Sequence, residues 1–193
     1  MTMISAYLAG PDVFLPNPIA QADLKKAICL QHGIKGVFPL DAVLNLDGLS
    51  KNEAGRKIGA ANRQLIQSCD IVIANITPFR GPSADVGTVF EIGYACGLGK
   101  DVYVYSNDSE PFSQRTREWV DGAFYQDTTV IVDNFGMSIE DFDMVDNLMI
   151  PEAVKCVTVG RVPYDEYYTS LKVFETCLER IAEDLSSNTD SSV

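Results

Sequence analysis

Short apolar runs alternate along the chain with longer segments in which apolar residues recur at helical spacing. Short apolar runs bounded by turn residues are typical of strands buried on both faces of a sheet, whereas a recurrence of three to four positions is typical of amphipathic helices. The pattern predicts strands over residues 3–8, 36–40, 70–76 and 102–105, with a fifth over 128–132. It predicts helices over residues 18–31, 51–68, 85–98 and 164–185.

This alternation of strands and helices predicts an α/β fold built on a parallel sheet. The chain contains no internal repeat and no linker, so we expect a single domain over residues 1–185 and a polar, frayed tail over 186–193. Ligands of such folds bind outside the carboxyl ends of the strands, where the strand order reverses. The loops that follow the first three strands are therefore the places to look for a site.

The composition narrows the chemistry that these loops can perform. The chain has a single histidine, His32, and its five cysteines are scattered without a CxxC pair, so no histidine triad or metal framework is expected. Asp and Glu number 27 against 15 Lys and Arg, for a net charge of -12. This balance argues against nucleic acid polymers and anionic membranes as partners. Acid–base work falls mainly to carboxylates.

The chain shows no sign of export or membrane insertion. It has no apolar run of about 18 residues, and its first residues lack the charged and apolar regions of a signal peptide. An odd number of scattered cysteines is typical of a reducing compartment. We therefore expect a cytoplasmic protein.

The densest candidate for a site is the segment 78–95, which joins a loop to a predicted helix. Glu91 lies in the second turn of that helix, where the positive end of the helix dipole favours an ionised carboxylate. It flanks a helical stripe that we assign to the core. The stripe consists of Val86, Val89, Phe90 and Gly93.

Asp85 lies six residues before Glu91, and at a helix start its side chain can turn into the same crevice. Paired carboxylates in different environments cleave glycosidic bonds, one as acid and the other as nucleophile or base. Each candidate also has a plain structural interpretation. Asp85 can be an N-cap, Glu91 a solvated helix residue, Tyr7 a core residue and Asn62 a surface residue.

Taken in order, several stretches of the chain resemble the nucleoside 2-deoxyribosyltransferases. The resemblance extends from the first strand to about position 150. It is carried by YLAGP at 7–11 with Phe14, DIVIAN at 70–75, PFRG at 78–81, DVGTVFEIG at 85–93 and NLM at 147–149.

The resemblance implies a flavodoxin-like, doubly wound sheet with helices on both faces, and transfer of 2-deoxyribose between nucleobases without a cofactor. Glu91 matches the family's nucleophile, which forms a covalent deoxyribosyl intermediate and so retains configuration. Asp85 matches the residue that exchanges a proton with the base. Tyr7 matches a tyrosine that orients the nucleophile.

The resemblance also implies residues that bind a deoxynucleoside and a nucleobase. Asn147 and Met149 match residues that enter a neighbouring subunit's site, which implies a homo-oligomer with shared sites. Asn62 aligns with a sugar-contacting position. Gly10 and Phe14 belong to the first loop, on which base selectivity partly depends.

Two other functions stay open on the same scaffold. One is a hydrolase of deoxynucleoside 5′-monophosphates, which requires a phosphate cradle in the first loop. Asp12 stands in that loop and is expected to repel phosphate. The other is a nucleoside-binding domain that forms no covalent intermediate. The choice between purines and pyrimidines and the number of subunits also stay open, and the stretch from Asp108 to Val145 has no functional interpretation.

Overall fold

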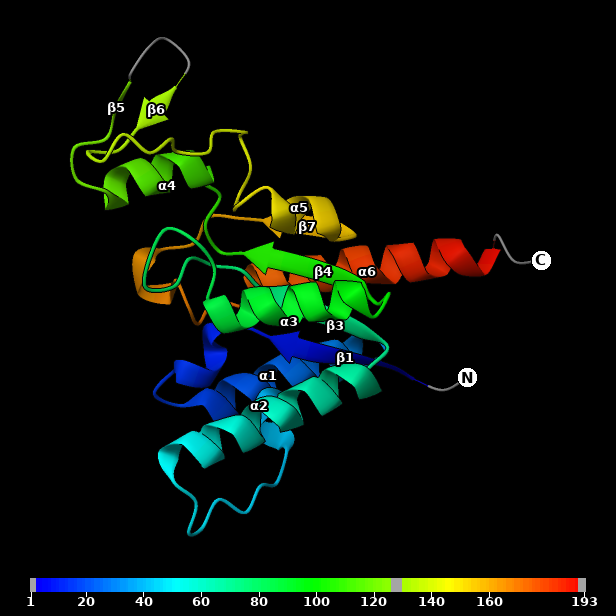
Figure 1. The fold of residues 1–193 in the computed structure, drawn as a ribbon. Coiled ribbons are helices and arrows are strands. Elements are labelled where there is room, and N and C mark those ends of the chain that lie inside the picture. The colour runs from blue at the N-terminus through cyan, green and yellow to red at the C-terminus, as the bar shows by residue number, and fades with distance from the viewer. Residues whose placement is uncertain (1–2, 126–129, 191–193) are drawn as a thin grey trace.

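A computed structural model of the protein describes residues 3–125 and 130–190. Five parallel strands form the central sheet in the order β2-β1-β3-β4-β7 (Figure 1). This arrangement confirms the predicted α/β class and is the flavodoxin-like order, in which the chain reverses direction across the sheet between β1 and β3. The strands are β1 Ile4–Ala9, β2 Ile34–Val37, β3 Ile71–Asn75, β4 Asp101–Ser106 and β7 Cys156–Val159.

Helices cover both faces of this sheet, and the side chains of β1 alternate between them. Ala6 and Leu8 face a core built with α1 and α6, whereas Tyr7 and Ala9 face a second core built with α2, α3 and α5. None of the described helices is both long and apolar enough to cross a membrane. The helices are α1 Pro18–Gln31, α2 Lys51–Ser68, α3 Val86–Gly97, α5 Met149–Ala153 and α6 Lys172–Asp190.

Local signals explain why the two predicted helices at 18–31 and 51–68 are confirmed. The side chain of Asn17 caps α1, and Pro18 occupies its first position. Ser50 and Glu53 form a reciprocal capping box at the start of α2. Such caps satisfy backbone N–H groups that have no partner inside the helix.

The edge strands of the sheet differ from the prediction. The second strand ends at Val37, because Pro39 opens a 3-10 turn, Pro39–Asp41, in place of the predicted strand end. The predicted strand over 128–132 does not join the central sheet, whose fifth strand is β7. Of residues 128–132, the first two lie outside the described residues, and Ile131–Val132 forms β6, which pairs antiparallel with β5 Phe124–Tyr125 in a separate small sheet.

The last helix is shifted along the chain. A 3-10 turn, Tyr164–Glu166, precedes α6, which begins at Lys172 rather than at 164. Asn107 explains the delay, because its amide donates to the backbone carbonyls of Tyr167 and Ser170 and so stabilises non-helical backbone there. Residues 186–190, expected as a polar tail, continue the helix.

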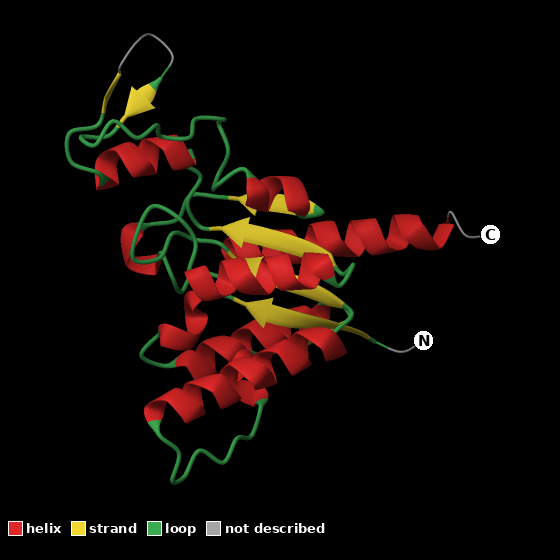
Figure 2. Cartoon of the chain, in the orientation of Figure 1, coloured by secondary structure: helices red, strands yellow, loops and turns green. Residues whose placement is uncertain are grey.

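The loops that follow the strands gather at one end of the sheet, opposite the two termini (Figure 2). At this end a projecting arm, defined as α4 Phe112–Trp119 with β5 and β6, extends away from the sheet (Figure 1). The arm falls within the stretch 108–145 that the sequence left without an interpretation. The carboxyl end of the sheet, where these loops meet, is therefore where a ligand-binding site is expected.

Candidate active site

The first loop leaves β1 at the reversal of strand order and is held close to β3. Gly10 adopts a φ of 151°, and a Cβ atom at this position would lie 2.6 Å from an Asp12 carboxylate oxygen and 2.7 Å from Asn75 Cβ. Only glycine therefore fits where the chain turns into the 3-10 helix Pro11–Phe14. This close approach fixes the path of the loop over the end of the sheet.

Tyr7 and Glu91 meet between the sheet and α3. Tyr7 points from β1 towards the α2 and α3 face, and its hydroxyl donates a hydrogen bond of 2.6 Å to Glu91 Oε1. The tyrosine is fully buried, and burial together with the charge of Glu91 raises its pKa well above the ordinary value. Tyr7 therefore remains a protonated donor to the carboxylate.

Glu91 is a carboxylate in an environment that resists its charge. Its pKa is raised to about 7, chiefly by burial and also by the nearby charge of Asp85, while hydrogen bonds from Tyr7 and Asn62 act in the opposite direction. The expectation that the helix dipole favours the ionised form is thus wrong in its net result. Desolvation outweighs the favourable hydrogen bonds, so both protonation states are populated near neutral pH.

Asp85 and Asn62 complete the cluster around Glu91. Asp85 is the N-cap of α3, and one of its oxygens accepts from the backbone N–H of Thr88 at 3.0 Å and from the Thr88 hydroxyl at 3.2 Å. Asn62 comes from α2, and its buried Oδ1 has no hydrogen-bond partner among the described residues. The N-cap interpretation of Asp85 is therefore confirmed, and its charge lies close enough to raise the pKa of Glu91.

Of the α3 stripe assigned to the core, only Val89 packs against it. Val86 is 84% exposed and Phe90 57% exposed, and Gly93 also faces outwards. The buried side of the helix consists of Thr88, Ile92 and Ala95. Because α3 is apolar on most of its circumference, helical spacing fits either stripe, and the pattern alone does not choose between them.

Two aromatic rings and an arginine flank the first loop, and sequence reasoning missed two of the three. The ring of Phe14 stacks on that of Phe79, with centroids 5.3 Å apart. The guanidinium of Arg80 lies 5.2 Å from the Phe14 centroid and 4.6 Å from that of Phe79. Arg80 has a φ of 57°, which a non-glycine residue rarely adopts. The available signal was an aromatic-arginine pair in the loop after a buried strand.

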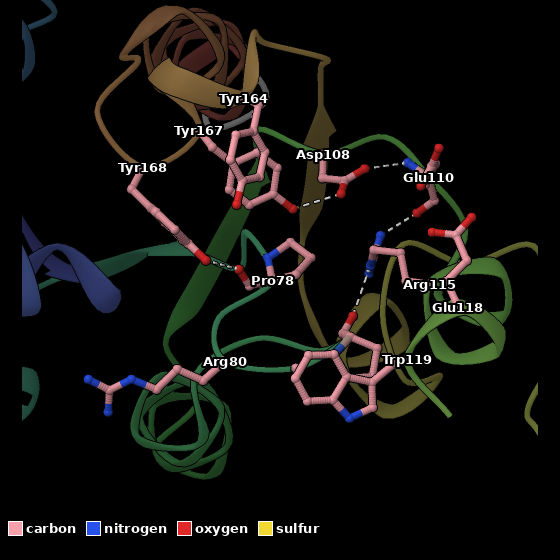
Figure 3. A pocket seen from close by; sticks show the side chains of 12 residues that line it. Pro78, Arg80, Asp108, Glu110, Arg115, Glu118, Trp119, Tyr164, Tyr167 and Tyr168 are labelled. Atoms are coloured by element: carbon pink, nitrogen blue, oxygen red, sulfur yellow. Dashed lines mark hydrogen bonds between the residues drawn. The ribbon is translucent and has the colours of Figure 1, made fainter. Parts of the chain in front are cut away.

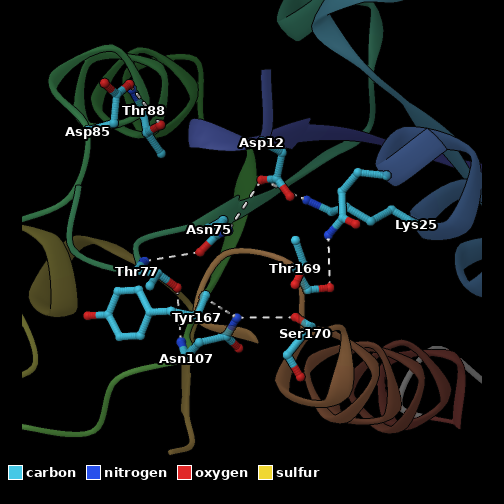
Figure 4. A network of polar contacts seen from close by, with 11 residues as sticks. Asp12, Lys25, Asn75, Thr77, Asp85, Thr88, Asn107, Tyr167, Thr169 and Ser170 are labelled. Atoms are coloured by element: carbon cyan, nitrogen blue, oxygen red, sulfur yellow. Dashed lines mark hydrogen bonds and ion pairs between the residues drawn. The ribbon is translucent and has the colours of Figure 1, made fainter. Parts of the chain in front are cut away.

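Asp12 is buried beside a cation rather than exposed in the first loop, where it was expected to repel phosphate. It is 2% exposed and forms an ion pair of 3.3 Å with Lys25, which is fully buried. Asn75 Nδ2 donates to the same Asp12 oxygen at 3.3 Å, and a chain of polar contacts continues from Asn75 through Thr77 to Asn107 (Figure 4). Sequence reasoning missed Lys25 because lysine is almost never fully buried.

Among the described residues, no hydrogen bond links Asn147 or Met149 to Glu91. The Asn147 amide donates to Glu140 at 2.7 Å, and its oxygen accepts from the Met149 backbone at 3.2 Å. Met149 is 64% exposed at the start of α5. The segment is therefore ordered and presents an apolar side chain outwards.

A cavity of about 660 Å³ lies beside the arm, between the loop after β3 and the 3-10 turn at 164–166 (Figure 3). Its wall includes Arg80, Arg115, Trp119 and Tyr164, but none of the Glu91 cluster. We place the candidate site at Glu91 rather than in this cavity, because the perturbed carboxylate lies at the reversal of strand order. Among residues 3–125 and 130–190, no three His, Cys, Asp or Glu side chains gather as a metal site would require.

The geometry defines a flavodoxin-like α/β protein with an acidic site at its strand-order reversal. Residues 6–149 match the nucleoside 2-deoxyribosyltransferase family, and this span is well over half of the chain. The chain belongs to that family.

The chain is also similar to individual proteins and solved structures. An uncharacterized protein of Schizosaccharomyces pombe is 35% identical over 115 residues, which cover 58% of this chain and 54% of the relative, so the match spans about half of that protein. The 2-desoxiribosyltransferase structure from Leishmania mexicana is 26% identical with a TM-score of 0.59, covering 91% of this chain and 97% of the other. A conserved protein from Enterococcus faecalis V583 shares the fold at 16% identity, with a TM-score of 0.54 and coverage of 93% and 99%.

Proposed function

We propose that the protein transfers 2-deoxyribose from one nucleobase to another, with Glu91 as the nucleophile. The observation that carries the proposal is the Glu91 environment: a partly buried carboxylate, hydrogen-bonded to Tyr7, with its pKa raised to about 7. A carboxylate that is poorly solvated is a more reactive nucleophile than one surrounded by water. The family match and the deoxyribosyltransferase structure support this choice of chemistry.

The proposed reaction is a double displacement at C1′ of a deoxynucleoside. A Glu91 oxygen forms a bond to C1′ as the bond from C1′ to the base nitrogen breaks, and Asp85 supplies a proton to the departing base. A second base then attacks C1′ from the vacated side, gives up its proton to Asp85 and displaces Glu91. Two inversions leave the configuration at C1′ unchanged.

The remaining site residues are assigned to positioning and binding. Tyr7 donates a hydrogen bond to one Glu91 oxygen, which leaves the other oxygen to attack C1′. Asn62 donates to Glu91 and keeps a buried carbonyl oxygen without a partner, which suits a sugar hydroxyl. Gly10 lets the first loop approach the sheet, and Phe14 presents a ring at which a base can stack.

We further propose that a second copy of the chain completes the site. Val86 and Phe90 are exposed on the outer side of α3, next to Glu91, and Met149 is exposed on a separate segment. Large exposed apolar side chains grouped near a site are typical of an interface. In this arrangement Asn147 and Met149 of one subunit enter the site of its neighbour. The five free cysteines support a reducing, cytoplasmic setting.

The direct test measures base exchange between a deoxynucleoside and a free nucleobase, with purine and pyrimidine donors and acceptors in all combinations. The wild type is expected to exchange and Glu91→Ala to lose exchange. Incubation with a slow 2′-fluoro nucleoside should add the sugar mass to Glu91, as read by peptide mass spectrometry. A variant that exchanges normally contradicts the role of Glu91, and binding without exchange or adduct indicates a non-enzymatic nucleoside-binding protein.

One observation removes an objection to a second candidate, hydrolysis of deoxynucleoside 5′-monophosphates. The acid of the first loop, Asp12, is buried against Lys25, so it presents no charge that would repel a phosphate. A comparison of 5′-phosphorylated and unphosphorylated substrates separates the two functions. Faster base release from the phosphorylated substrate, without transfer to an added base, would favour the hydrolase.

A further inference from the structure

Arg115 is a buried cation whose hydrogen bonds all end on backbone carbonyls. It lies on α4, is 7% exposed and lines the cavity beside the arm (Figure 3). Its Nε donates to the carbonyl of Pro82 at 2.8 Å, and its terminal nitrogens donate to the carbonyls of Glu110 and Val145. One side chain thus joins the loop after β3 to the segment that precedes Asn147.

Asp146 joins the same two segments from the other side. It is fully buried and accepts from the hydroxyl of Ser83, from the backbone N–H of Ala84 at 2.8 Å and from that of Asn147 at 2.8 Å. Ala84 directly precedes Asp85, the cap of α3. The two charges, Arg115 and Asp146, therefore fasten the Asp85 loop to the Asn147 segment at neighbouring points.

These charges are not compensated by ion pairing. Among the described residues, neither Arg115 nor Asp146 has an oppositely charged group within 4.0 Å. Burying a charge is costly, and here directional, charge-assisted hydrogen bonds offset the cost. Because such bonds are satisfied only when the two segments lie at one relative position, the pair specifies that position.

We propose that Arg115 and Asp146, here called the clamp, are positioning residues for two sites at once. The clamp sets Asp85 in its own subunit and Asn147 in the segment lent to a neighbouring subunit. This proposal rests on the proposed function, in which Asn147 contacts the sugar across an interface. It assigns a role to α4, the part of the arm that carries Arg115.

The clamp predicts that one substitution has two different effects, depending on which subunit carries it. Glu91→Ala chains lack the nucleophile but lend an intact Asn147, and Asn147→Ala chains do the reverse. Hybrids of the two, co-expressed with different tags and purified through both, should be more active than either variant alone. In these hybrids the complete site combines Glu91 of one chain with Asn147 of the other.

Asp146→Asn is then added to one chain of the hybrid at a time. In the chain that lends Asn147, it should raise KM for the deoxynucleoside about tenfold and leave kcat nearly unchanged. In the chain that supplies Glu91 and Asp85, it should lower kcat about tenfold, because small displacements of a proton-transfer group are costly. Asp141→Asn, an exposed acid in the same stretch, is the matched control and should change neither constant.

Equal effects in both placements, or none, would overturn the proposal, since a structural role does not depend on the chain that carries the change. Ser83→Ala covers the case in which Asp146→Asn hybrids fail to assemble. It removes one donor to Asp146 and should give the same division between KM and kcat at about fivefold. Hybrids no more active than their parents, beside an active wild type, would overturn the clamp and leave the Glu91 chemistry intact. An inactive wild type would instead overturn the proposed function.

Discussion

Two carboxylates lie near the same end of the sheet and are held in opposite ways. Asp12 is 2% exposed and meets a buried cation, Lys25, whose ammonium lies 5.0 Å from the ring of Phe174 and 5.5 Å from that of Tyr105. Glu91 is partly buried, and its donors among the described residues, the Tyr7 hydroxyl and the Asn62 amide, are neutral. The first is paired with a cation, whereas the second has no cationic partner within 4.0 Å among the described residues and its pKa is raised to about 7.

The comparison shows which surroundings favour a reactive carboxylate over a structural one. A carboxylate with a cationic partner has its charge satisfied, and removing the partner leaves an unpaired buried charge. A carboxylate with neutral donors and a neighbouring acid keeps a raised pKa and an accessible proton near pH 7. If these partners, rather than burial alone, set the properties of the two carboxylates, substitutions at Glu91 and at Lys25 should have different effects.

The largest effect is expected for Glu91→Gln. Exchange should fall by about a factor of 10⁴ or more, because the nucleophile is lost. The same substitution should raise the free energy of unfolding at neutral pH. Since the pKa of Glu91 is raised in the fold, ionisation disfavours folding, and the wild type loses stability as pH rises from about 4.5 to about 7.

Glutamine does not ionise, so Glu91→Gln should not lose stability over this pH range. Relative to the wild type, it should gain about 3 kcal/mol in the free energy of unfolding between pH 4 and pH 8. Urea titrations at the two pH values measure the gain. A stability difference that does not change with pH would show that Glu91 titrates normally and would remove the contrast with Asp12.

The next largest effect is expected for Lys25→Met. Breaking a buried ion pair on one side costs about 3–5 kcal/mol, because Asp12 is left charged and unpaired. The double variant Lys25→Met/Asp12→Asn should recover most of the stability. A single variant as stable as the wild type would contradict a structural role for the pair.

Much of the fold follows from the sequence, and the failures have physical causes. The helices at 18–31 and 51–68 carry their own caps, Asn17 and Ser50, so local chemistry fixes their ends. The fifth strand, β7, was missed because it is short and only partly buried, and its pairing with β4 is a long-range contact. Such pairing leaves little trace in local periodicity.

Part of the candidate site also follows from the sequence, and part does not. Tyr7, Asp85 and Glu91 were each predicted, and the structure brings Tyr7 and Glu91 into contact. Lys25 and the pKa of Glu91 were not predicted, because both depend on burial by distant segments. Residue order predicts which groups meet at the sheet end, but desolvation decides their protonation.

Tyr7→Phe should change the pH dependence of the exchange rate. The hydrogen bond from Tyr7 lowers the pKa of Glu91, so its loss should move the acid limb of the rate profile from near 7 to higher pH. The rate at pH 7 should fall about tenfold to a hundredfold. The matched control is Tyr103→Phe, which removes a 2.6 Å hydrogen bond between another tyrosine and the carboxylate of Asp184. That variant should leave both the rate and the limb unchanged, and a Tyr7→Phe limb that moves to lower pH would contradict the assignment.

The smallest effect is expected for Asn62→Ala. Asn62 lowers the pKa of Glu91 less than Tyr7 does, so the acid limb should move upwards by less than in Tyr7→Phe. Its free carbonyl oxygen is also lost, which should raise KM for the deoxynucleoside about fivefold. Asn52→Ala removes an exposed asparagine from the same helix and should change neither quantity. A normal limb with a raised KM would restrict Asn62 to substrate binding and leave Tyr7 as the neutral donor that distinguishes Glu91 from Asp12.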